Sequence, residues 1–372
     1  MKIISIDDLC ELTTNRQTIV TATDSNVMAE IFPSAQVDCN PPLNLSGNSD
    51  ADLFVHSPVP HLYKSPHIAG RVSLAVLSDI RMLTPHGLLF DSGGNLIAES
   101  YHNTKMVQIV LREVQTMLSD GLVNTEPTKT IKTPAMLLMG PWSWVYHHWI
   151  LENLPRLWAV DEFPELGKVP LVVPGDITEF QEASLKALGI GSNQVIPFDG
   201  SNWRFKRLFV PSFLAPSGHS HRQVQWLRNK LFDGLGIIPN STGSKRIHIS
   251  RVDANGRKIV NEDEVVALLN SYNFETVVPG SLSIRDQVNI FNNASIICGA
   301  GGSGLTNHIF APEGITLIEM QPESYINRCY WFLSNICGQD YAFVIGRNET
   351  DRHDYRIEIE SLEKTLTQVL AN

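Results

Sequence analysis

Cysteine is scarce in this chain, with five scattered copies among 372 residues and no CxxC pair. A secreted domain held by disulfides and a structural zinc site built on paired cysteines are therefore both disfavoured. Apolar runs are also short, since no stretch approaches the roughly 18 uninterrupted residues of a membrane-spanning helix. The chain reaches Asp7 and Asp8 before any long apolar region, unlike a secretory signal. We expect a soluble protein of a reducing cytoplasm.

Basic residues are fewer than acidic ones, 29 Lys and Arg against 39 Asp and Glu, which gives a formal net charge of −10. This deficit argues against a dedicated nucleic-acid-binding protein and against electrostatic docking on an anionic membrane. The hydrophobic content of 43% is enough for two cores. Because a domain commonly has roughly 100–200 residues, the length predicts two of them.

Prolines and short β-like runs, such as 72–77 and 87–90, dominate the first part of the chain. Further on, strand-like runs alternate with helical patterns, of which His221–Leu235 is the strongest. A polar linker at 239–244 precedes a second strand–helix series. The alternation predicts an α/β protein with parallel sheets. We expect residues 1–238 to form an N-terminal domain with a β-rich start, and residues 239–372 to form a C-terminal domain.

Glycines gather at 299–304, where an apolar strand-like run gives way to a helical pattern. Backbone N–H groups at such a turn can approach an anion, and the helix N-terminus adds a partial positive charge. The GxGxxG spacing also fits the dinucleotide fingerprint, and Glu319 follows at the end of the next strand, where an acid holds ribose hydroxyls. The position late in the chain and the early Pro312 oppose a dehydrogenase. A tight turn with packing glycines is the alternative.

Cations are concentrated in the segment 245–258, where Asp253 is the only acid. Arg251 and Arg257 flank the turn that should follow the first strand of the second domain. Ligands of open parallel sheets bind at the carboxyl ends of the strands, and guanidinium groups pair with phosphate in a bidentate manner. The segment therefore predicts a diphosphate clamp facing the glycine loop, with a solvated loop as the alternative.

Aromatic and titratable residues are concentrated in the segment 142–157. His148 and Glu152 are four residues apart, which places them on one face of a helix. Rings beside polar groups suit the faces and hydroxyls of sugars, and core packing is the alternative. His219 and His221 offer two metal ligands, but no third ligand keeps spacing with them. A helix start capped by Ser220 is therefore the preferred interpretation of that segment.

In their order and spacing, several blocks resemble glycosyltransferase family 61, which includes bacterial capsular-polysaccharide transferases and eukaryotic xylosyl-, arabinosyl- and N-acetylglucosaminyltransferases. The blocks are 146–149 with 154–157; 249–251 with Arg257 and 261–262; 282–283 with Gln287; and 302–307 with 318–319. The family commonly has histidine where this chain has Gly301.

The resemblance implies a GT-B architecture, two Rossmann-like domains facing a cleft, with the nucleotide-sugar donor held by the C-terminal one. It implies an inverting transfer from a nucleoside-diphosphate sugar, with a UDP-sugar as the expected donor, onto a glycan acceptor in surface or capsular polysaccharide synthesis. No cofactor and no metal is required by this scheme, and the DxD at 50–52 lies outside the expected nucleotide domain. The expected place of action is the cytoplasm, with the inner face of the membrane as an alternative.

Inverting transfer needs a base for the acceptor hydroxyl and stabilisation of the departing diphosphate. We expect His148 to be the base, with Glu152 and Asp253 as alternatives. The residues expected to hold the diphosphate are Arg251, Arg257, Gly302, Ser303, Gly304 and Asn307. Glu319 is expected to bind the ribose or the sugar.

Two other functions stay open from the residues alone. An NAD(P)-dependent oxidoreductase is motivated by the GxGxxG spacing and Glu319, and nicotinamide-cofactor binding without UDP binding would favour it. A non-catalytic glycan-binding protein on the same fold is motivated by Gly301 in place of the family histidine. That alternative predicts binding of a donor nucleotide or a glycan without product.

Overall fold

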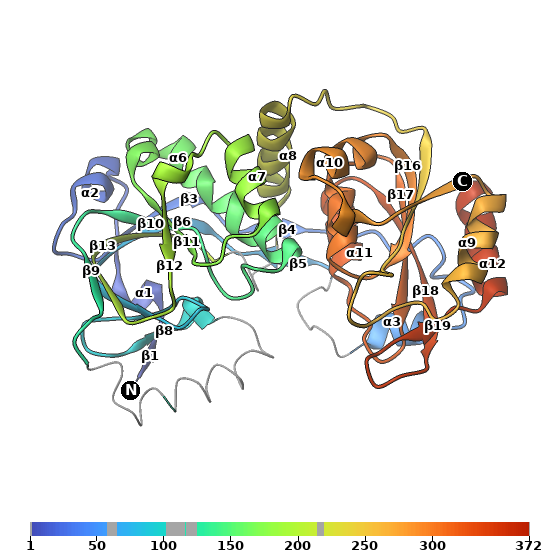
Figure 1. Ribbon diagram of the computed structural model, residues 1–372, viewed down its shortest axis with the longest axis horizontal. Helices are drawn as coiled ribbons and strands as arrows, with labels where there is room; N and C mark the ends of the chain where they lie inside the picture. Colours follow the sequence, from blue (N-terminus) through green and yellow to red (C-terminus); the bar gives the residue numbers. More distant parts are fainter. Residues whose placement is uncertain (1, 58–64, 102–115, 117–124, 214–218, 372) are drawn as a thin grey trace. The chain divides into compact units, whose positions relative to one another are not determined.

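The computed structural model describes residues 2–57, 65–101, 116, 125–213 and 219–371. The chain divides into two compact units (Figure 1). Unit 1 comprises Met1–Ala35 and Ile68–His219, and unit 2 comprises Gln36–His67 and Ser220–Asn372. A two-stranded sheet of β4 (Ala35–Val37) and β5 (His67–Ala69) lies where the chain passes between these segments. Among the described residues, no helix has both the length and the apolar content to cross a membrane.

Unit 1 is built on a mixed sheet in which eleven strands of the described segments take part. Its central order is β6-β13-β10-β11-β12. The strand β13 pairs in parallel with β10 and antiparallel with the long strand β6. The strands β10, β11 and β12 are parallel and are joined by helical crossovers. The chain therefore winds outward from β10 and then returns to the other side of β10 as β13, so the winding direction reverses beside β10.

The strands of unit 1 are β1 (Ile3–Ile4), β2 (Glu11–Leu12), β3 (Val27–Phe32), β6 (Val72–Leu83), β7 (Leu88–Phe90), β8 (Leu96–Ile97), β9 (Lys129–Ile131), β10 (Ala135–Leu137), β11 (Leu171–Pro174), β12 (Val195–Phe198) and β13 (Trp203–Pro211). Its helices and helical turns are α1 (Ile6–Leu9), α2 (Arg16–Thr21), η1 (Ala98–Tyr101), α5 (Tyr146–His148), η3 (Trp149–Asn153), η4 (Leu154–Leu157), α6 (Trp158–Glu162), η5 (Pro164–Lys168), α7 (Glu179–Ala187) and η6 (Ser192–Gln194).

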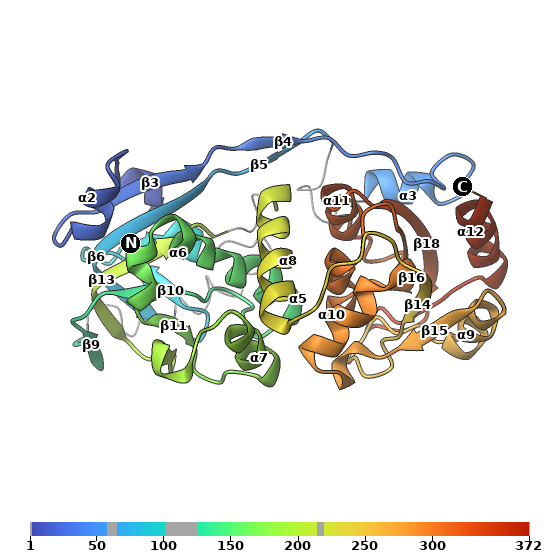
Figure 2. The ribbon, with the colours of Figure 1, turned by 90° about the horizontal axis from the view of Figure 1, so that it is seen from above.

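Unit 2 is a doubly wound α/β unit with the strand order β15-β14-β16-β17-β18-β19. All neighbouring pairs from β15 to β18 are parallel, and only β19 is antiparallel. In both views, α10 and α11 lie on one face of this sheet and α9 and α12 on the other (Figures 1 and 2). The first two strands of the series, β14 and β15, are followed by β16 on the far side of β14, so the winding reverses between β14 and β16. This order is the flavodoxin-like one, whose ligands bind at that reversal.

The strands of unit 2 are β14 (Lys245–Ile249), β15 (Phe274–Val277), β16 (Ala294–Ala300), β17 (Thr316–Pro322), β18 (Asp340–Asn348) and β19 (Tyr355–Arg356). Its helices and helical turns are α3 (Ala51–His56), α8 (His221–Leu235), α9 (Glu262–Ser271), η7 (Pro279–Ser281), α10 (Ile284–Asn292), η8 (Ser303–Phe310), α11 (Cys329–Ile336) and α12 (Ile359–Ala371).

Several sequence predictions are confirmed. The chain is α/β with mainly parallel pairing in the two winding series, and its beginning is rich in strands. The helix at His221–Leu235 has the predicted bounds. The Ser220 hydroxyl accepts a hydrogen bond from the Gln223 N–H, and Gly236 ends the helix in the left-handed region at φ 62°. A left-handed residue after the last turn is a common helix stop, and glycine adopts it without strain.

The compact units differ from the expected division at residue 238, because the segments 36–67 and 220–238 both belong to unit 2. Phe54 of α3 is buried and stacks on Phe343 of β18, with ring centroids 4.3 Å apart. Asn44 is also buried; its amide donates to the Phe343 carbonyl at 2.7 Å and accepts from the Phe343 N–H at 3.2 Å. The Asn44 side chain thus pairs with the backbone N–H and carbonyl of Phe343 at a place where β18 has no second neighbouring strand to bond them. The roles expected for the two domains stay predictions.

Asn44→Ala should lower the free energy of unfolding by about 2–4 kcal/mol, because it leaves a buried N–H and a buried carbonyl unpaired. Urea unfolding monitored by circular dichroism measures the change. Ser49→Ala, an exposed substitution in the same segment, is the control and should change little. Equal stability of the two variants would show that the segment does not contribute to unit 2.

Candidate active site

The carboxyl end of β10 leads into the loop that carries the aromatic residues. The Ser143 hydroxyl bonds both to the Gly140 N–H and to the Gly140 carbonyl, which closes a tight turn. Inside this turn Trp142 takes a positive φ of 64°, which is unusual for a residue with a large side chain. Its indole lies near two rings, Trp144 at 5.5 Å and His148 at 6.3 Å between centroids. The turn thus presents indole rings beside a histidine.

A π-helical turn follows at Trp149–Asn153, where the Leu154 N–H bonds to the Trp149 carbonyl five residues earlier. In a regular α-helix, positions five apart lie about 140° from each other around the axis. The wider π-turn brings such positions toward the same face, so His147 and His148 both lie near Glu152. Turns of this kind are frequent at functional sites. Trp149 is fully buried and donates to the Ser184 hydroxyl at 2.8 Å, which anchors the turn.

His148 and Glu152 form a close pair, with 2.7 Å between Nδ1 and Oε1. Burial by itself lowers the pKa of His148, but the charge of Glu152 and its hydrogen bond outweigh burial and raise that pKa. Because Nδ1–H is directed at the carboxylate, the neutral ring keeps Nε2 as its proton acceptor. The structure therefore brings together the expected base and the first of its alternatives.

Arg156 lies behind this pair and is buried. Burial lowers its pKa to about 9, although the negative charge of Glu152 opposes that shift. The guanidinium donates to the Met139 carbonyl at 2.7 Å and lies 4.1 Å from the centre of the Phe213 ring. Arg156 thus joins the end of β10 to the segment after β13 and places a positive charge near Glu152.

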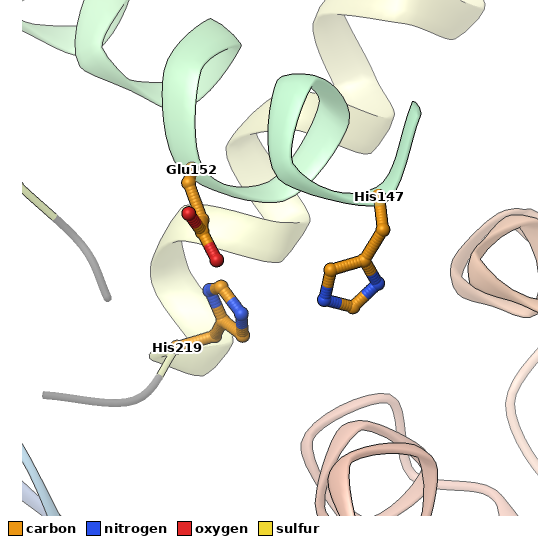
Figure 3. A group of neighbouring side chains, drawn as sticks. All are labelled: His147, Glu152 and His219. Atoms are coloured by element: carbon orange, nitrogen blue, oxygen red, sulfur yellow. The ribbon is translucent and has the colours of Figure 1, made fainter. Parts of the chain in front are cut away.

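His219 follows β13, and its side chain is directed toward His147 and Glu152 (Figure 3). The donor atoms of these three residues all lie within 4.8 Å of one another, close enough to be ligands of one metal ion. His221 does not join this group, because its Nδ1 contacts the Ile336 carbonyl at 2.8 Å, and the preferred interpretation of 219–221 as a helix start capped by Ser220 is confirmed. Ser220 between His219 and His221 is extended as a helix cap, so its two neighbours diverge. The partners of His219 come from the π-turn, which no spacing in the sequence reveals.

In unit 2, the glycine loop packs closely against two charged side chains. A Cβ on Gly302 would collide with the Arg251 guanidinium, and a Cβ on Gly301 would lie 2.6 Å from Oε1 of Glu319. A side chain at Gly301 would therefore require Glu319 to move. The Tyr330 hydroxyl donates to the Gly302 carbonyl at 2.6 Å and holds the loop from α11.

Arg251 follows β14 and is largely enclosed. Its Nη2 donates to the Gly256 carbonyl at 3.1 Å, and its buried Nε has no hydrogen-bond partner among the described residues. Burial, followed by the charge of nearby Arg257, lowers the pKa of Arg251. Arg257 has a positive φ of 56° and its guanidinium lies 5.1 Å from the centre of the Tyr325 ring. Arg251 and Arg257 are thus two neighbouring positive charges with little negative charge beside them. This arrangement favours the binding of an anion at this place.

Glu319 of β17 is buried. The Tyr341 hydroxyl and the Gln321 amide donate to its Oε2, at 2.7 and 3.2 Å. Burial raises the pKa of Glu319 to about 8, against the opposing effects of the Tyr341 hydrogen bond and Arg257. The carboxyl is therefore neutral at pH 7. The expected contact of Glu319 with ribose or sugar stays a prediction. The hydrogen-bond partners of its carboxyl among the described residues are the side chains of Tyr341 and Gln321.

The remaining expected residues lie at the same end of the sheet but differ in exposure. Ser303 begins η8 and is half-buried, with Gly304 beside it. Asn307 is buried and its amide donates to Gln287 of α10 at 2.7 Å. Asp253 is exposed in the turn after β14 and its carboxylate lies against Gly280. Asp253 therefore belongs to unit 2, whereas His148 and Glu152 belong to unit 1.

Sequence reasoning missed His147 and His219 as a group with Glu152, and it missed the tyrosines of unit 2. Tyr330 and Tyr341 belong to α11 and β18, and both hydroxyls are directed at the glycine loop or at Glu319. No motif marks them, since each tyrosine stands alone in an apolar segment. The position of Tyr341 beside Glu319 depends on the pairing of β17 with β18, where Glu319 is opposite Phe343.

Comparisons with known proteins show similarity to glycosyltransferases over part of the chain. Residues 146–318 match the family model described as Glycosyltransferase 61. The matched segment begins in α5 and ends in β17, so it includes His147, Glu152 and His219 of unit 1 and the arginines and glycine loop of unit 2 but stops one residue before Glu319.

Two curated relatives are similar to part of this chain. The EGF domain-specific O-linked N-acetylglucosamine transferase of Mus musculus is 33% identical over 104 residues, which are 27% of this chain and 20% of the relative. The beta-1,2-xylosyltransferase XAX1 of Oryza sativa subsp. japonica is 27% identical over 112 residues, which are 27% of this chain and 19% of the relative. The matched segments thus span about a fifth of the length of these relatives.

The stability of the protein should depend on pH through Glu319. The folded state keeps this proton up to about pH 8, whereas the unfolded state loses it near the ordinary pKa of 4.5. The free energy of unfolding of the natural protein should therefore fall, relative to that of Glu319→Gln, as pH rises from about 5 to 8. Above pH 8 the difference should be constant.

Urea unfolding at several pH values measures this difference. Glu313→Gln, at an exposed position, is the matched control and should follow the natural protein throughout. A Glu319→Gln variant that also follows the natural protein from pH 5 to 8 would show that Glu319 ionises normally in the folded state.

Proposed function

We propose that this chain is a glycosyltransferase with a GT-B architecture, which moves a sugar with inversion from a nucleoside-diphosphate donor to a glycan acceptor. The enclosed pair Arg251 and Arg257 beside the glycine loop is the observation that carries this proposal. Arg251 lies at the winding reversal of unit 2, the position at which doubly wound sheets bind ligands. The match of residues 146–318 to the Glycosyltransferase 61 family model supports the same chemistry.

The donor diphosphate would bind to unit 2. The Arg251 guanidinium has an unused Nε–H, and Arg257 adds a second positive charge nearby. Backbone N–H groups at the start of η8, from Ser303 onward, would complete the contacts. These fixed charges would stabilise the negative charge that develops on the departing diphosphate. The buried carboxyl of Glu319 lies close to Gly301, and because burial raises its pKa to about 8, it would add little negative charge that repels the donor.

The acceptor would bind to unit 1, where Trp142, Trp144 and His86 form an aromatic cluster. Trp144 is 41% exposed, so its indole can pack on a sugar ring. The strained backbone of Trp142 is of the kind that folds maintain at functional sites. His148 lies against this cluster, and its Nε2 would take the acceptor proton as the hydroxyl oxygen attacks the anomeric carbon. The bond from that carbon to the diphosphate breaks on the opposite face, which inverts the configuration.

UDP-N-acetylglucosamine and UDP-xylose are the first donors to examine, because the two relatives are named for these sugars. A surface or capsular glycan is the proposed acceptor, and the cytoplasm, at or near the inner face of the membrane, is the proposed place of synthesis. The scheme needs no cofactor.

Arg251→Ala should weaken UDP binding at least tenfold, since it removes the enclosed guanidinium. Isothermal titration calorimetry with UDP, GDP, CMP, ADP and NAD, each with and without a divalent metal, measures the affinities. Arg285→Ala removes an exposed arginine of the same unit and should leave binding unchanged. Binding of NAD alone would overturn the proposal and favour an oxidoreductase.

His148→Gln should reduce the transfer rate by about 10²–10⁴-fold, the usual contribution of a general base, while donor affinity stays the same. UDP release with a panel of oligosaccharide acceptors measures turnover, and the anomeric configuration of the product, determined by NMR, checks inversion. His56→Gln, a substitution at an exposed histidine of unit 2, is the control. Donor or glycan binding without any product in the natural protein would favour the non-catalytic alternative.

A further inference from the structure

We propose that His147, Glu152 and His219 form a binding site for one transition-metal ion, with Zn²⁺ as the best-suited ion. This site goes beyond the proposed sugar transfer, with which it shares Glu152 and for which the sequence led us to expect no metal. Two imidazoles and one carboxylate are a ligand set that zinc proteins use where the metal keeps an open position for water or a substrate.

The arrangement of the three donors supports the proposal. Their ligand atoms lie within 4.8 Å of one another, and Figure 3 shows the rings and the carboxylate turned toward a common point. Zinc takes nitrogen and oxygen ligands at about 2.0–2.2 Å. The separations between the three ligand atoms are therefore close to those of a zinc site. Small rotations of the side chains would bring all three atoms within bonding distance of one ion.

The fold explains why these side chains meet. The strands β10 and β13 are parallel neighbours, so their carboxyl ends lie at the same edge of the sheet. The segment after β10 leads to His147 and Glu152, and the segment after β13 leads to His219. The π-turn then brings His147 to the same face as Glu152. The site thus lies at the winding reversal of unit 1, the place where open α/β sheets bind ligands.

The neighbouring groups are compatible with a cation. His148 donates to one oxygen of Glu152, and a carboxylate has a second oxygen with free lone pairs. A ligand that is held by a hydrogen bond from a neighbouring residue is typical of metal sites. The positive charge of Arg156 interacts with Glu152 as well, and it is turned toward the Met139 carbonyl and the Phe213 ring. Zinc also binds to ligand sets that contain no carboxylate at all. A single carboxylate that is also hydrogen-bonded to His148 is therefore sufficient for this site.

Titration of the chelator-treated full chain with Zn²⁺, followed by calorimetry, tests the site. The natural protein should bind one ion per chain. His147→Gln and His219→Gln should each weaken binding at least tenfold, because each removes a ligand. Co²⁺ should give the visible absorption bands of a low-coordinate site in the natural protein, and these bands should be lost in both variants.

His56→Gln is the matched control, since it removes an exposed histidine outside the group, and it should bind the metal like the natural protein. Circular dichroism and the melting temperature without metal verify that each variant is folded. Absence of stoichiometric binding to the natural protein, or equal affinity in His219→Gln, would overturn the proposal. Because His147→Gln and His219→Gln leave the His148–Glu152 pair intact, loss of metal and loss of sugar transfer can be distinguished.

Discussion

The parallel pairing of neighbouring strands is the constraint on which the rest of this structure depends. In unit 2 it brings the carboxyl ends of β14 and β16 together, so that Arg251 packs directly on the glycine loop. In unit 1 the same constraint brings the segments after β10 and β13 together, with His147 and His219 on them. In each unit the chain changes its winding direction at this point. In unit 2 the helical crossovers diverge there and leave the strand ends accessible to side chains and ligands.

Charge is distributed differently at the two places. Unit 2 holds two neighbouring arginines, and its buried acid, Glu319, has a pKa raised to about 8 by burial. The local excess is positive, which suits a diphosphate. Unit 1 holds imidazoles and an acid that is hydrogen-bonded to one of them, an arrangement that suits proton transfer or a metal cation. The separation of these chemistries agrees with the proposed donor and acceptor roles of the two units.

Gly301 and Gly302 illustrate how packing and function combine. The fingerprint spacing alone suggests that glycine is needed for a phosphate to approach. The structure gives a second reason, because the places of both Cβ atoms are close to charged side chains of the protein itself. The presence of glycine where the family commonly has histidine is therefore accompanied by a carboxyl group in the neighbouring space. Glycine at this position therefore has a steric explanation within this chain.

The sequence by itself determined the α/β class, the strong helix at His221–Leu235, the glycine loop with its arginines and the His148–Glu152 pair. These features depend on local periodicity, on capping residues or on positions within one turn of helix, and such features are visible in a single segment. Only the tertiary structure decided that residues 36–67 complete unit 2, that Tyr341 lies on Glu319, and that His219 joins His147 and Glu152. Each of these contacts connects segments distant in sequence. Which segments become neighbours depends on strand order and on an irregular π-turn, and no local pattern contains that information.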